Sequence, residues 1–191
     1  RDPLIEACRF AEAKDARMPG FGRQLHAFIA PLFAARGQAH FRLARAACLL
    51  HDVAWRAHPD YRHENCFDLA TRANMAGVSH RERVFLGLAL LHRYKNNRTG
   101  SRFQPLFDLL DEKERLDAEQ LGKAMRFGAM FSGQVAAQMG EMTWRPRKKV
   151  LEFHMATGAQ DLFGEVAEAR FMSLAASLGA EKVEVKGPNG T

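Results

Sequence analysis

The sequence predicts a mainly α-helical protein with a small β-α-β appendage near its end, and three observations support this. Apolar residues recur at the spacing of amphipathic helices over most of residues 1–139. Prolines and glycines divide that pattern into segments. After residue 145, two short strand-like runs flank one amphipathic helix. We therefore expect an all-α region over residues 1–143, the appendage over 148–187, and a disordered tail over 188–191.

The helical segments follow one another along the chain, and several have recognisable ends. Pro59 separates two of them, and Ser79 and Glu82 have the spacing of a capping box, in which each residue satisfies a free backbone N–H of the other. The segment over residues 40–56 is apolar on two faces, which is typical of a buried helix. The expected helices cover residues 4–17, 25–33, 40–56, 61–73, 79–94, 105–110 and 116–139.

The last helical segment contains an unusual number of glycines. Each glycine in a helix costs about 1 kcal/mol relative to alanine, so we expect close contacts between helices at these positions. They are Gly122, Gly128, Gly133 and Gly140.

The appendage begins where the chain changes character. Residues 150–155 have the pattern of a strand, residues 161–178 that of an amphipathic helix, and residues 181–185 alternate as a second strand does.

Composition favours an intracellular domain. A chain of 191 residues buries enough apolar surface to fold without disulfides, and Cys8, Cys48 and Cys66 lack metal-binding spacing, so we expect buried, reduced thiols. No apolar run approaches the roughly 18 residues of a membrane span, and no signal peptide is recognisable. We therefore expect a cytoplasmic protein without a membrane partner. Because the chain starts with Arg1 rather than Met, we expect it to be part of a longer protein.

The net charge of +6 favours a polyanionic partner. Nucleic acid is a poor candidate, because most of the fourteen Phe residues lie on apolar helical faces instead of among basic residues. The sequence also lacks the glycine-rich phosphate loops, the nucleophile elbow and the HExxH motif, so it indicates no nucleotide-dependent or catalytic centre of those kinds. We assign no catalytic residue.

One possible metal site involves His51 and Asp52, preceded by His26 on an earlier helical segment. Adjacent His and Asp can share a metal ion with a His from a second helix, as in metal-dependent phosphohydrolases of the HD superfamily. The closing carboxylate is expected in a later helix, but the best-matching segment, Arg126 to Ala129, has alanine at that position. We therefore favour a structural role for His51 and Asp52, and keep a metal centre of His26, His51 and Asp52 as the alternative.

Two basic clusters are candidates for binding a phosphate polymer, because Arg donates to phosphate oxygens in pairs and Lys acts as a point charge. Cations at the end of a helix also complement its dipole, which is the alternative explanation. The first cluster comprises Arg93, Lys95, Arg98 and Arg102, and the second contributes His58 and Arg62.

The stretch from Ala46 to Arg62, followed by Gly77–His80 and Leu88–Tyr94, resembles the C-terminal region of the exopolyphosphatase and guanosine pentaphosphate phosphohydrolase (Ppx/GppA) family. Softer similarity extends over Arg1–Ala7 and Leu151–Gly164. The resemblance implies an HD-like helical domain followed by a small α/β element. It also implies N-terminal actin-like domains that hold the catalytic Glu and the magnesium ion, so no cofactor is expected here.

Three functions are compatible with the sequence. The first is the C-terminal domain of an exopolyphosphatase-like hydrolase, which extends the polyphosphate channel and supports a homodimer, with polyphosphate or guanosine pentaphosphate as substrate. The second is a stand-alone HD-type metallophosphohydrolase. The third is a non-catalytic interaction scaffold.

Overall fold

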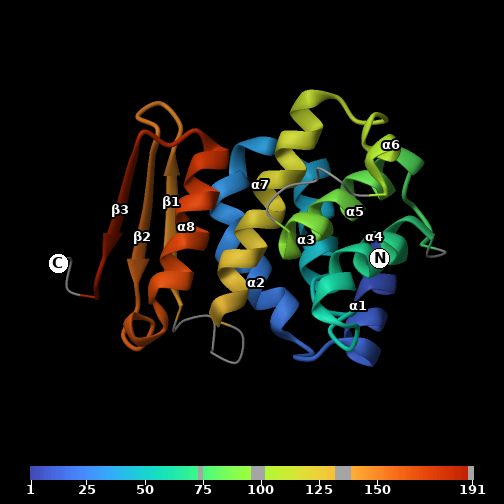
Figure 1. The fold of residues 1–191 in the computed structure, drawn as a ribbon, viewed down its shortest axis with the longest axis horizontal. Coiled ribbons are helices and arrows are strands. Elements are labelled where there is room, and N and C mark those ends of the chain that lie inside the picture. The colour runs from blue at the N-terminus through green and yellow to red at the C-terminus, as the bar shows by residue number, and fades with distance from the viewer. Residues whose placement is uncertain (73–74, 96–101, 132–138, 189–191) are drawn as a thin grey trace.

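The computed structural model describes residues 1–72, 75–95, 102–131 and 139–188. A helical bundle occupies one side of the molecule and a small sheet the other, with α7 and α8 between them (Figure 1). The predicted class, mainly α with a small α/β appendage, is confirmed. The helices are α1 (Pro3–Asp15), α2 (Phe21–Ile29), α3 (Gln38–Leu50), α4 (Arg62–Arg72), α5 (His80–Tyr94), α6 (Gln104–Phe107), α7 (Glu112–Gly128) and α8 (Glu165–Leu178).

Helix α3 ends earlier than the sequence pattern indicates. The expected helix over residues 40–56 is wrong in its last part, because α3 stops at Leu50 and successive turns follow it. The hydroxyl of Tyr94 donates to the carbonyl of His51 at 2.5 Å, and the indole N–H of Trp55 donates to the carbonyl of Asp15 at 3.0 Å. These tertiary bonds hold the backbone in the turns, so His51 is the C-cap of α3 and not a residue in its middle.

Capping boxes start α5 and α7. The amide of Glu82 donates to Oγ of Ser79 at 3.1 Å and the amide of Ser79 donates to Oε1 of Glu82 at 3.0 Å, which confirms the predicted box. Asp111 and Glu114 form a second box, so α7 begins at Glu112, earlier than expected.

The C-terminal sheet has three strands in the order β1-β2-β3. Strand β1 (Gly140–Arg145) is antiparallel to β2 (Val150–Met155), which is parallel to β3 (Lys182–Lys186). The predicted β-α-β unit is thus confirmed as β2-α8-β3, although α8 begins at Glu165 and not at residue 161.

Strand β1 was not expected. The predicted helix over 116–139 gives way to a short 3-10 turn over Ala129–Phe131, and residues 132–138 lie outside the described part. Gly140 begins β1 with φ of 112°, and a Cβ there would lie 2.1 Å from the carbonyl oxygen of His154. The position requires glycine because of strand pairing, and not because of a helix contact.

Close helix contacts are confirmed at two of the four glycines. A Cβ on Gly122 would lie 2.4 Å from the carbonyl oxygen of Ala89 on α5, and one on Gly128 would lie 2.5 Å from Cδ1 of Leu25 on α2. Gly133 lies outside the described residues.

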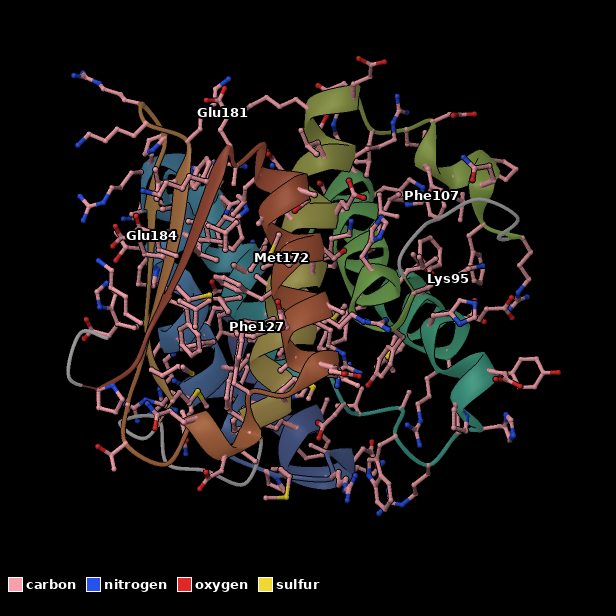
Figure 2. The ribbon with its side chains drawn as sticks, turned by 60° about the vertical axis from the view of Figure 1, so that its left-hand side comes forward. Lys95, Phe107, Phe127, Met172, Glu181 and Glu184 are labelled. Carbon is pink, nitrogen blue, oxygen red and sulfur yellow. The ribbon has the colours of Figure 1, made fainter. Side chains whose placement is uncertain are left out.

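One hydrophobic core joins the helices to the sheet. Phe127 of α7 lies at its centre (Figure 2), with ring centroids 5.3 Å from Phe153 of β2 and 5.1 Å from Phe171 of α8. The β-α-β unit therefore packs on the bundle through aromatic contacts.

The three cysteines are buried and unpaired, as predicted. Burial raises the pKa of Cys8 and Cys66 to about 12 and that of Cys48 well above its ordinary value. Among the helices of the described residues, none combines the length and the apolar character needed to cross a bilayer. The tail expected over 188–191 lies outside the described residues, apart from Pro188.

Candidate anion-binding site

Three arginines from three packed helices form the candidate site, which we call the arginine cluster. Arg93 lies near the end of α5, Arg126 near the end of α7 and Arg170 on α8. Helix α7 lies between α5 and α8, so the three side chains come from neighbouring helices (Figure 1). Their charges affect one another: burial and the positive charge of Arg93 lower the pKa of Arg126. Burial and the charges of Arg126 and Arg93 lower the pKa of Arg170 to about 10.

Arg93 is positioned by the turn that follows α3. Its Nε lies 3.4 Å from Nδ1 of His51, and its guanidinium lies over the ring of Tyr94, 4.4 Å from the centroid. His51 is 3 % exposed, and burial, aided by the charge of Arg93, places its pKa well below the ordinary value. The imidazole is therefore neutral at pH 7, so Nδ1 has a lone pair to accept from Arg93.

Asp52, the neighbour of His51, holds the chain between α1 and α2. Its Oδ2 accepts from the amide of Met18 at 3.3 Å, while Oδ1 lies 3.9 Å from Nε2 of His51. Burial raises the pKa of Asp52. The His-Asp pair thus has the contacts of a structural unit that connects two turns and orients Arg93.

Arg170 and Arg126 border a hollow of about 310 Å³ between α7 and α8. Nη1 of Arg170 donates to the carbonyl of Arg126 at 3.3 Å and contacts Sδ of Met130 at 2.8 Å. Ser173 also lines the hollow, and so does Glu165, which forms no ion pair with either arginine.

Within the described residues, no member of the arginine cluster forms an ion pair with a carboxylate. Three arginines elsewhere in the domain are paired. The carboxylates of Asp117, Asp2 and Glu114 pair with Arg36, Arg42 and Arg81, respectively. The charge of Arg93 interacts with the carboxylate of Asp52, but no carboxylate among the described residues is ion-paired with any of the three arginines. Guanidinium groups in such a setting suit phosphate oxygens.

The described members of the first basic cluster have different surroundings in the structure. Arg93 is in the arginine cluster, and Lys95 follows as the C-cap of α5, on the side of the bundle away from the sheet (Figure 2). Arg102 is paired with Glu64 at 3.2 Å and with Asp68 at 2.8 Å, so its charge is already compensated. Arg98 lies outside the described residues.

The second cluster is similarly occupied by local contacts. Nε of Arg62 donates to the carbonyl of Ala57 at 3.1 Å, and Nδ1 of His58 accepts from the amide of Asp60 at 3.3 Å. These contacts fit local turn and helix-capping roles.

Arg126 and Arg170 are not among the basic residues that the sequence singles out. Arg126 was considered only as a neighbour of the missing carboxylate, and Arg170 lies within an amphipathic helix without any special pattern. Only the packing of α5, α7 and α8 brings them beside Arg93.

The possible metal ligands do not converge in the described structure. The ring of His26 packs edge-on against Phe41 at 4.7 Å, whereas that of His51 packs against Phe21 at 5.8 Å. No group of three or more His, Cys, Asp or Glu side chains among the described residues is placed to hold a metal ion. Ala129 is the C-cap of α7 and offers only a methyl group.

Fold and site together define a mainly helical domain that carries a terminal α/β unit and an uncompensated arginine cluster. Residues 4–185 match the family described as exopolyphosphatase, C-terminal. The match covers nearly the whole chain, so the chain belongs to this family, and the suspected Ppx/GppA membership is confirmed. No curated protein matches the chain.

Proposed function

We propose that this chain is the phosphate-chain-binding C-terminal domain of an exopolyphosphatase-type hydrolase, and that the arginine cluster holds the chain. The observation that carries the proposal is that the charges of Arg93, Arg126 and Arg170 act on one another, while none of the three is ion-paired with a carboxylate among the described residues.

In the domain as described, none of the three arginines is ion-paired with a carboxylate. Burial is the main cause of the lowered pKa values of Arg126 and Arg170, and repulsion between the like charges adds to it. A bound polyanion reverses the sign of these interactions, since each phosphate oxygen accepts hydrogen bonds from a guanidinium. Binding should therefore be favourable and strongly salt-dependent.

The remaining basic residues are expected to differ in how much they contribute to binding the phosphate chain. Lys95 is half-buried at the end of α5 and Arg98 follows it in the sequence, so both remain candidates for continuing the path from Arg93. Arg102 contributes less, because it is ion-paired with Asp68, whereas Arg62 and His58 each use one nitrogen in a local backbone contact.

The proposed function assigns the chemistry to another part of the parent protein. Family membership supports N-terminal actin-like domains that hold magnesium and release terminal phosphate from polyphosphate or guanosine pentaphosphate. The present domain would hold the chain in register for those domains, and a homodimer would join two such surfaces. Under this proposal the domain alone binds polyphosphate but does not hydrolyse it.

Replacing Arg126 tests the proposal directly. The side chain of Arg126 makes no hydrogen bond or ion pair within the described part, so Arg126→Gln removes one charge without breaking such a bond there. Losing a hydrogen bond to a charged group costs about 1.5–3 kcal/mol, so affinity for long-chain polyphosphate should fall by about ten-fold or more. Titration calorimetry at two salt concentrations measures both the affinity and its salt dependence.

The matched control is Arg102→Gln, which removes the same charge from an arginine already paired with Glu64 and Asp68. Equal losses in the two variants would show that only net charge matters and would contradict the cluster. A wild-type domain that binds no polyphosphate at low salt would instead favour the scaffold interpretation.

A further inference from the structure

A second basic hollow lies on α1, α2 and α3, and it shares no residue with the arginine cluster. We call it the α2–α3 groove. Its larger part has a volume of about 680 Å³, and an adjoining part of about 300 Å³ shares Arg23, His26, Ala27 and Arg45 with it and extends to Phe41. The larger part is lined by Arg9, Glu12, Gly20, Arg23, Gln24, His26, Ala27, Arg45 and Leu49.

The groove is positively charged. Arg23 and Arg45 form no ion pair with any carboxylate among the described residues, and Arg9 pairs only with the exposed Glu6, at 3.2 Å. The one acidic side chain in the lining, Glu12, is directed to the backbone. Its two oxygens accept from the amides of Gly20 at 3.0 Å and Gly22 at 2.9 Å.

Two buried polar atoms at the groove have no partner in the described protein. They are Nε2 of His26, whose residue is 8 % exposed, and Oε1 of Gln24. Buried polar groups of native proteins are nearly always hydrogen-bonded, so each such atom requires an explanation. Burial and the charge of Arg45 lower the pKa of His26, so its ring is neutral and able to donate or accept.

An aromatic ring lies at the outer end of the groove. Phe41 is 47 % exposed, and its ring packs edge-on against His26 with centroids 4.7 Å apart. An exposed ring beside arginines offers a stacking surface to a flat ligand next to its phosphate partners. An inorganic phosphate chain has no apolar or flat group to place against this ring or against the apolar side chains of Ala27 and Leu49.

We propose that the α2–α3 groove binds a mononucleotide, with the phosphate on Arg23 and Arg45, the base against Phe41, and polar groups of the ligand at His26 and Gln24. The site is separate from the arginine cluster, so the proposal holds whether or not the cluster binds polyphosphate. Recognition combines charge, stacking and buried hydrogen-bonding groups, as expected for a small-molecule site.

The experiment titrates the domain with ADP, GDP and, as an aromatic-free comparison, inorganic pyrophosphate. At least one nucleotide should bind saturably at micromolar to millimolar concentration, about ten-fold more tightly than pyrophosphate. Arg45→Gln should weaken that binding by about ten-fold. Phe41→Ala should weaken it by about five-fold or more, because a base stacked on an aromatic ring contributes about 1 kcal/mol or more. Arg126→Gln, which changes only the arginine cluster, should leave it unaltered.

Thermal melting shows whether each variant is folded. If Arg45→Gln does not fold, Arg23→Gln takes its place, because Arg23 is exposed. Absence of saturable binding by both nucleotides overturns the proposal. Pyrophosphate affinity equal to that of the nucleotides overturns it as well, as does a loss with Arg126→Gln as large as that with Arg45→Gln.

Discussion

Replacing Gly122 with alanine is expected to destabilise the domain by about 2 kcal/mol net, since a clash with backbone lies at the upper end of the 1–3 kcal/mol that overpacking typically costs. The added Cβ would lie 2.4 Å from the carbonyl oxygen of Ala89 and 2.4 Å from Cβ of His92, both on α5. Neither atom is the end of a flexible side chain, so the two helices must move apart. The propensity gain of about 1 kcal/mol for Gly to Ala offsets only part of this cost. Urea denaturation of both proteins measures the difference.

The same substitution should weaken polyphosphate binding. Arg93 follows His92 on α5, and Arg126 lies about one turn beyond Gly122 on α7. The α5–α7 distance therefore sets the separation of two members of the arginine cluster.

Gly164→Ala is the matched control. Nothing lies within 4 Å of a Cβ at Gly164, which is the N-cap of α8. Its effect should stay below about 1 kcal/mol. If both variants were equally stable, the close approach of α5 and α7 at Gly122 would be wrong.

Acid is expected to destabilise the domain between about pH 6.5 and pH 4, and His40 should account for a large share. Its ring lies between Phe33 and Phe85, with centroids at 5.1 Å and 6.1 Å, and neither ring nitrogen has a partner among the described residues. The pKa of His40 is lowered to about 4, mainly by burial and further by the charges of Arg36 and Lys113.

The sign of the effect follows from proton binding. Above pH 6.5 the imidazole is neutral in both the folded and the unfolded state, so it adds no pH dependence. As the pH falls toward 4, the unfolded chain binds a proton that the folded protein excludes, and stability is lost. At about 1.36 kcal/mol per pH unit, the loss from His40 at pH 5 is about 2 kcal/mol.

His40→Leu should remove this share. Urea denaturation measures the free energy of unfolding at pH 7 and at pH 5. Between these two pH values the variant should lose about 2 kcal/mol less of it than the wild type does. His80→Gln, at an exposed histidine, should keep the full loss. An unchanged loss in His40→Leu would show that this ring does not exclude a proton in the folded state.

Local sequence patterns determined much of the fold. Helical periodicity located the main helices because their apolar faces meet one core, and the Ser79–Glu82 box fixed the start of α5 through bonds between near neighbours. The β2-α8-β3 unit was visible for the same reason, since each element carries its own periodicity.

The sequence also determined the family, and its net charge of +6 favoured a polyanionic partner. The sequence did not determine the role of His51 and Asp52. The helical pattern continued past Leu50, yet bonds from Tyr94 and Trp55 end α3 there. Each of these two bonds joins the turns after α3 to a distant part of the chain, so local periodicity cannot predict it.

Tertiary structure alone decided where the positive charge gathers. Arg93, Arg126 and Arg170 lie on three helices and become neighbours only when α5, α7 and α8 pack, whereas Arg102, beside Arg93 in the predicted set, is neutralised by Glu64 and Asp68. Electrostatic interaction depends on distance in space and on the surrounding medium, and neither follows from spacing along the chain. The sequence supplied the number of charges, and folding decided which of them remain uncompensated within the described protein.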